Sequence, residues 1–168
     1  MSTFQLDQNI DDSRVVQACS AEGHGEAVRL PPSLRNALDP ELLSVVMVGP
    51  CPLVTLDRSL PREHAAHIPD RNPGMVVVTN YPKRFQTMTS RIALRVLANL
   101  KCSFPAWYDC PLANSILEVT GEGVAVGHVL RGVYITDGYF EFTADTWPAA
   151  LQTVLQQNAT RILPALPG

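Results

Sequence analysis

The sequence has little charge of either sign and no run of basic residues. Charged residues make up 17% of the chain, the formal net charge is −3 and the pI is near 5.7. A protein that holds nucleic acid needs clustered Lys and Arg side chains against the phosphates. We therefore predict that nucleic acid is not a partner.

Long hydrophobic runs are also missing. The longest apolar stretch, residues 42–54, is too short for a bilayer and is broken by Pro50 and Pro52. The first twelve residues carry three acids and no basic residue, unlike a secretory signal. These absences predict that no membrane is bound and that the location is cytoplasmic.

Cysteine is scarce, and no Cys-x-x-Cys pair occurs among the four: Cys19, Cys51, Cys102 and Cys110. In the absence of a secretion signal, this pattern predicts reduced thiols. His64 and His67 stand as His-x-x-His without the Glu and the further ligand of a zinc signature. We therefore expect no metal and no cofactor.

Hydrophobic residues, in contrast, make up 46% of the 168 residues. With so few charges to cover a surface, this composition favours a homodimer or a large pocket. The length fits one ordinary domain. Residues 1–28 show no sustained apolar period and are predicted to form a mobile arm, which leaves residues 29–168 as a single domain.

The strongest helical pattern covers roughly residues 79–101, where apolar side chains recur every three or four positions. The Met-Val-Val-Val stretch before it, taken alone, is typical of a strand. Asp39-Pro40-Glu41 predicts the start of a short helix. A last helix is predicted from Thr146 to about Gln157.

Apolar and β-branched runs predict strands at residues 45–48 and 53–56. A later series predicts an antiparallel meander at 116–120, 124–130, 133–136 and 139–143, with Asp137-Gly138 as a hairpin turn. The chain is therefore expected to have an α+β fold in which the long helix is wrapped by an antiparallel sheet.

The polar loop at residues 57–74 adds a resemblance. Arg62-Glu63-His64 and Pro73-Gly74-Met75 stand in that order before the predicted helix. This order resembles the A-factor biosynthesis branch of the hot-dog superfamily. More distantly, His67-Ile68-Pro69-Asp70 is similar to the His-Phe-Pro-Gly element of 3-hydroxyacyl-acyl-carrier-protein dehydratases. The resemblance covers roughly residues 42–143 and implies a hot-dog fold.

It also implies acyl-thioester chemistry, with acyl-CoA or acyl carrier protein as the partner. His64 or His67 would be the general base, and Gly74 at the helix start would help to stabilise an oxyanion. The other substrate-binding candidates are Arg62, Met75, Thr79, Asn80 and Trp107.

Thr79 stands where the dehydratases carry an acid, so dehydration is not expected. Acyl transfer or thioester hydrolysis fits better, as a thioesterase or an acyltransferase-like enzyme. The alternative is a non-catalytic domain of the same fold that binds an acyl chain or a partner protein, and the sequence leaves both open.

Overall fold

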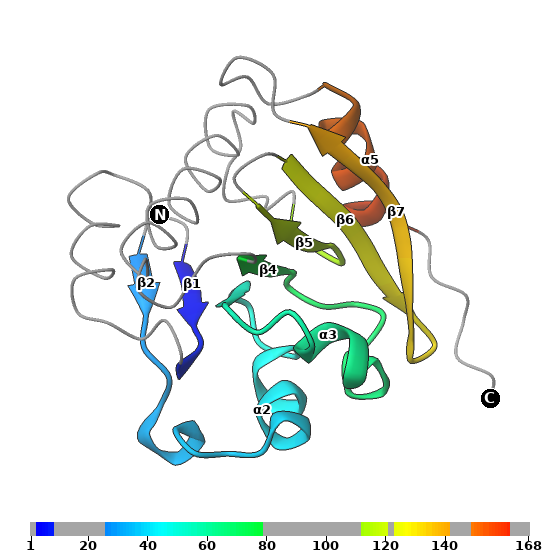
Figure 1. Ribbon diagram of the computed structural model, residues 1–168. Coiled ribbons are helices and arrows are strands. Elements are labelled where there is room, and N and C mark those ends of the chain that lie inside the picture. Colours follow the sequence, from blue (N-terminus) through cyan, green and yellow to red (C-terminus); the bar gives the residue numbers. More distant parts are fainter. Residues whose placement is uncertain (1–2, 9–25, 79–111, 121–122, 142–148, 162–168) are drawn as a thin grey trace.

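The computed structural model describes residues 3–8, 26–78, 112–120, 123–141 and 149–161 (Figure 1). They form a mixed fold of α-helices and β-strands, built on one seven-stranded sheet with the order β2-β1-β3-β4-β5-β6-β7. The strands are β1 (Thr3–Leu6), β2 (Glu26–Val28), β3 (Leu53–Thr55), β4 (Met75–Val78), β5 (Ile116–Val119), β6 (Gly123–Leu130) and β7 (Val133–Glu141).

The sheet has a parallel half and an antiparallel half. Strands β1 to β5 pair in parallel, whereas β5-β6 and β6-β7 are antiparallel. Parallel neighbours require crossover connections of about a dozen residues or more, and each connection among the first five strands is that long. The predicted antiparallel sheet is therefore confirmed for β5-β6-β7 and wrong for β1 to β5.

The N-terminal region contributes to the sheet. β1 lies between β2 and β3, and its alternating side chains Phe4 and Leu6 are only 1% and 2% exposed. A mobile arm is thus wrong for residues 3–6 and 26–28. Strands of three or four residues are too short to show a sustained apolar period, which is why the sequence pattern missed them.

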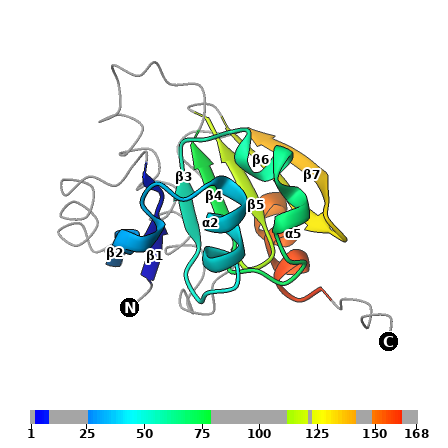
Figure 2. The same ribbon diagram turned by 90° about the horizontal axis from the view of Figure 1, so that it is seen from below.

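Helices cover both faces of the sheet (Figures 1 and 2). On one face lie α2 (Asp39–Val46), α3 (Leu60–Glu63) and the 3₁₀ turn η3 (Ala65–His67), and α5 (Ala149–Ala159) lies on the other; η2 (Pro32–Leu34) precedes α2. The strand predicted at 45–48 is wrong because α2 continues through Val46. Its buried residues Leu42, Leu43 and Val46 follow helical spacing.

The β6-β7 hairpin turns at Arg131-Gly132, not at Asp137-Gly138 as predicted. Arg131 and Gly132 have φ angles of 50° and 76°, and the flanking Leu130 and Val133 are paired. Two consecutive positive φ angles are typical of a type I′ turn. Asp137 is instead skipped in the register between Thr136 and Gly138, so it forms a β-bulge inside β7.

The predicted helix at residues 79–101 lies outside the described residues, as do Thr79, Asn80 and Trp107. The Met-Val-Val-Val stretch is strand β4, buried throughout. The hot-dog arrangement therefore stays a prediction, and the parallel half of the sheet does not support it. Cys51, the one cysteine within the described ranges, is a free thiol. Among the described helices, none has the length and apolar character needed to cross a membrane.

Candidate functional site

Two acidic side chains stand at the carboxyl ends of neighbouring parallel strands. Asp7 directly follows β1, and Asp57 comes two residues after the end of β3. Because β1 and β3 are adjacent and parallel, both acids lie at the same edge of the sheet, the one formed by the carboxyl ends of the parallel strands. Open parallel sheets bind their ligands outside this edge.

Thr55 links the two acids. Its hydroxyl donates a hydrogen bond of 2.6 Å to Asp7 Oδ2 and accepts one of 3.1 Å from the Asp57 backbone N–H. Asp57 Oδ1 in turn accepts bonds from the backbone N–H and the hydroxyl of Ser59, at 2.9 and 2.7 Å. Asp57 Oδ2 accepts no hydrogen bond from the residues that the structure describes. The two carboxylates are thus positioned by a short chain of hydrogen bonds.

The electrostatics of this edge disfavour a charged Asp7. Burial raises the pKa of Asp7 above its ordinary value, and the negative charges of Asp39 and Asp57 raise it further. The hydrogen bonds from Thr55 and from the Gln8 backbone N–H act in the opposite direction. A positive charge bound here would relieve the repulsion among the three acids.

His64, one of the two predicted bases, belongs to the same neighbourhood. Asp39 is the first residue of α2, and its Oδ2 lies 3.4 Å from His64 Nε2. The rings of His64 and His67 have centroids 6.4 Å apart, and the His67 side chain is exposed. The structure therefore brings His64 against a carboxylate whose charge acts on Asp7.

A fourth acid, Glu118 of β5, lies on the same face of the sheet as Thr55. Thr55, Val77 and Glu118 are in register on β3, β4 and β5, so Thr55 and Glu118 are about 10 Å apart at the usual strand spacing. Arg62 Nη2 lies 2.8 Å from Glu118 Oε1, and Arg58 Nε lies 3.7 Å from Oε2. Both arginines therefore extend from the segment that follows β3 to Glu118 on β5.

Arg62 is held from two sides. Its guanidinium also lies 4.7 Å from the ring centroid of Tyr134. Burial, followed by the charge of Glu118, raises the pKa of Tyr134 to about 12, so the phenol stays neutral at physiological pH. Arg62 thus has an ion-pair partner and an aromatic partner within the protein. Arg58 is the more accessible of the two arginines, with 63% of its side chain exposed.

The predicted residues Gly74 and Met75 lie elsewhere, at the amino end of β4. Gly74 has φ of 100°, and a Cβ atom at this position would lie 2.2 Å from the backbone oxygen of Leu112. Met75 is fully buried. The geometry explains Gly74 by close packing of two backbone segments, and Met75 by the hydrophobic core.

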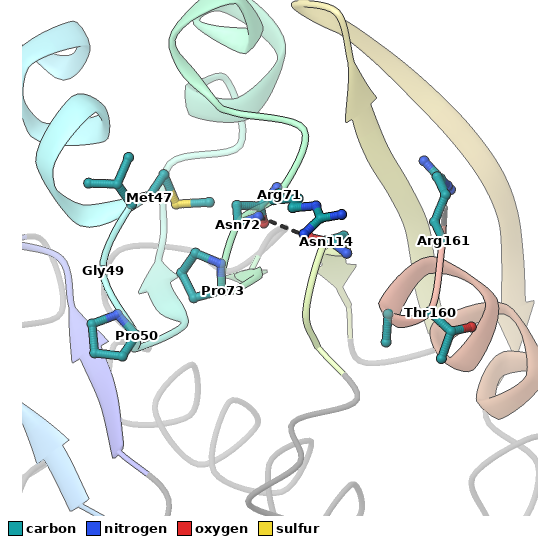
Figure 3. Close-up of a pocket in the computed structure, with 11 residues that line it drawn as sticks. Met47, Gly49, Pro50, Arg71, Asn72, Pro73, Asn114, Thr160 and Arg161 are labelled. Carbon is teal, nitrogen blue, oxygen red and sulfur yellow. Dashed lines mark hydrogen bonds between the residues drawn. The ribbon is translucent and has the colours of Figure 1, made fainter. Parts of the chain in front are cut away.

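A cavity of about 480 Å³ opens at the amino ends of β3, β4 and β5 (Figure 3). It is lined by the ends of α2 and α5 and by residues 71–73. The side-chain amide of Asn114 joins these segments: its Oδ1 accepts from the Asn72 backbone N–H at 2.9 Å, and its Nδ2 donates to the Asn158 carbonyl at 3.0 Å. Asp7 and Asp57 lie at the opposite edge, where the parallel strands have their carboxyl ends.

Asp7, Asp39, Thr55 and Asp57 are not among the site residues predicted from the sequence. The sequence does carry a pattern that points to Asp7 and Asp57. The apolar run that forms β1 is followed directly by Asp7, and the run that forms β3 is followed by Leu56-Asp57. Recognising it requires knowing that the two runs are parallel neighbours. The first of the two runs, β1, lies within residues 1–28, which the sequence pattern predicts to be an arm.

Comparison of the chain with protein-family models, curated proteins and solved structures finds no match. Within the described ranges, no three His, Cys, Asp or Glu side chains are grouped closely enough to hold a metal ion by themselves. A cation at this edge would therefore need ligands from water or from a substrate.

Proposed function

We propose that this protein is a divalent-cation-dependent phosphoester hydrolase whose site is the edge formed by Asp7, Thr55, Asp57 and Arg58. One observation carries the proposal: two carboxylates, joined through the Thr55 hydroxyl, lie at the carboxyl ends of adjacent parallel strands. Arg58, the next residue in the chain after Asp57, has an exposed side chain. Neither the acids nor the arginine is needed to close the hydrophobic core.

The carboxylates suit a magnesium-type ion. Mg²⁺ is commonly held by one or two protein carboxylates, while water and substrate phosphate oxygens complete its coordination. Asp57 Oδ2 and the Asp7 carboxylate would supply the protein ligands. Ionised Asp7 is disfavoured by burial and by its acidic neighbours, so a bound cation would also stabilise it in its charged form.

Arg58 suits the phosphate. A guanidinium forms paired hydrogen bonds with phosphate oxygens, and Arg58 follows Asp57 directly in the chain with most of its side chain exposed. In the hydrolysis, a water oxygen bonds to phosphorus and the bond from phosphorus to the leaving oxygen breaks. The leaving oxygen takes up the proton that the water loses. Arg58 would offset charge on the phosphoryl oxygens, and a divalent cation held by Asp7 and Asp57 would supply further charge stabilisation there.

The experiment combines binding and turnover. Titration calorimetry with Mg²⁺ and Mn²⁺ should show binding to the wild-type protein, and p-nitrophenyl phosphate mono- and diesters should be hydrolysed only with the metal present. Asp7→Asn and Asp57→Asn should each lose at least tenfold in both readouts. Asp70→Asn, which changes an acid next to the β6-β7 turn, is the matched control. Absence of both binding and turnover would contradict the proposal.

The acyl-thioester hypothesis remains open as a prediction from the sequence. His64 and Gly74, its base and its oxyanion surface, are separated in the described structure, since His64 contacts the start of α2 and Gly74 lies at the amino end of β4. Acyl-CoA and acyl-carrier-protein substrates should be assayed on the same preparation. Turnover that His64→Ala or His67→Ala abolishes would favour this hypothesis over phosphoester hydrolysis.

A further inference from the structure

The two edge strands of the sheet, β2 and β7, differ in length. At one edge, β2 has only three residues and begins with the exposed Glu26. At the other, β7 runs for nine residues from Val133 to Glu141, without proline or lysine. Natural edge strands are usually kept short, or carry lysine, proline or exposed charge, because their free backbone groups can pair with another chain. β7 has the length that invites pairing.

Asp137, the acid in the middle of β7, does not present a free charge that would prevent pairing with another strand. Asp137 Oδ2 lies 2.8 Å from His128 Nδ1 and accepts a 3.0 Å bond from Asn158 Nδ2, so its carboxylate is bound by β6 and α5. Three large apolar side chains of β7 are exposed instead: Val133 at 59%, Ile135 at 36% and Tyr139 at 52%. The bulge at Asp137 bends the strand but leaves a stretch of regular pairing on each side.

Opposite charges flank this strand. Arg131 is exposed in the turn before β7, and Glu141 is exposed at its end. When a strand pairs with its own copy in antiparallel orientation about a two-fold axis, its start meets the end of the other. Each Glu141 would then approach Arg131 of the other copy, and the exposed apolar side chains on both faces of β7 would gain a neighbouring strand.

We propose that β7 is the interface of a homodimer, in which the β7 strands of two copies pair antiparallel and join the two sheets into one. The pairing is isologous, so both copies contribute the same surface and the assembly closes at two chains. This interface lies at the opposite end of the strand order from β1 and β3, and it does not depend on the proposed hydrolase activity.

Light scattering after size-exclusion chromatography tests the interface. The wild-type chain should have twice the monomer mass of 18.4 kDa at micromolar concentration. Val133→Lys places a charge on β7 and should halve the mass. Val48→Lys changes a similarly exposed valine two residues after the end of α2, with 70% exposure, and should leave the dimer intact. A monomeric wild type, or a mass that follows Val48 and not Val133, would overturn the proposal.

A charge exchange tests the orientation without relying on Val133. Glu141→Arg should weaken dimerisation at least tenfold by placing two arginines together at each end of the pairing. Arg131→Asp combined with Glu141→Arg should restore it, because the opposite charges meet again. Aspartate also tolerates the positive φ of this turn position. If the double variant is no tighter than Glu141→Arg alone, the antiparallel pairing of β7 is wrong.

Discussion

Thr55 and Asp7, which lie 48 positions apart in the chain, meet through a 2.6 Å hydrogen bond between the Thr55 hydroxyl and Asp7 Oδ2. Both side chains are buried, with Asp7 8% exposed and Thr55 fully enclosed. The bond joins the ends of two parallel strands and holds a carboxylate in a place that disfavours its charge. The proposed function would use this carboxylate as a cation ligand, and the stability of the fold without a cation should then depend on its protonation.

Replacing Asp7 by asparagine should stabilise the protein near neutral pH. The pKa of Asp7 is raised above 3.8 in the folded state, so its favourable contribution is fully present below about pH 3.8 and is lost as the pH rises through the folded-state pKa. Asparagine cannot ionise and avoids that loss. In urea titrations without divalent cations, the advantage of Asp7→Asn should grow between pH 4 and pH 7. An advantage that is absent or independent of pH would contradict this.

Thr55→Val should destabilise the fold by about 1–2 kcal/mol at pH 7, because Asp7 loses a buried donor while the volume at position 55 is kept. Urea unfolding measures this loss. Thr153→Val on α5 is the matched control, since the Thr153 hydroxyl bonds only to the carbonyl one helical turn earlier at an exposed position. It should change stability by less than about 0.5 kcal/mol. Equal effects of the two substitutions would show that the Asp7 bond adds nothing.

The sequence predicted the antiparallel half of the sheet well, because β5, β6 and β7 are joined by short connections and their apolar runs are long enough to recognise. The parallel half was missed for a physical reason. Strands such as Thr3–Leu6 carry only two buried side chains, and the direction of pairing depends on crossovers that leave no local pattern. Asp137-Gly138 has the composition of a hairpin turn, but the turn lies at Arg131-Gly132. Asp137 forms a β-bulge within β7.

Asp137→Ala should loosen α5 from the sheet. The Asp137 carboxylate is a shared partner of His128 in β6 and Asn158 in α5, and Asn158 Nδ2 also donates to Ser115 Oγ at 3.1 Å. Removing the Asp137 carboxylate leaves His128 Nδ1 and one N–H of Asn158 without this partner. The free energy of unfolding should fall by about 2–3 kcal/mol. Chemical denaturation measures the loss. Asp70→Ala, which removes an acceptor for the exposed Arg131 backbone N–H, should cost less than about 1 kcal/mol.

The candidate site was only partly within reach of the sequence. His64 was singled out by its place before Pro-Gly-Met, and it does lie beside a carboxylate, Asp39. The acids themselves were not found, because Asp7 and Asp57 come together only through the parallel pairing of β1 and β3. Residue type and order can suggest single groups, whereas a constellation drawn from distant strands depends on topology.

Gly74→Ala separates a packing role from a ligand-binding role at the residue that the hot-dog resemblance placed at the oxyanion. Its φ of 100° strains any other residue, and the added Cβ would lie 2.2 Å from the Leu112 backbone oxygen. We expect a loss of about 3 kcal/mol or more in thermal or urea unfolding. At Gly49, the nearest atom to an added Cβ is 3.3 Å away, so Gly49→Ala should stay within about 1 kcal/mol. If Gly74→Ala folds as stably as the wild type but loses thioester turnover, Gly74 serves a ligand and the acyl-thioester hypothesis gains its first direct support.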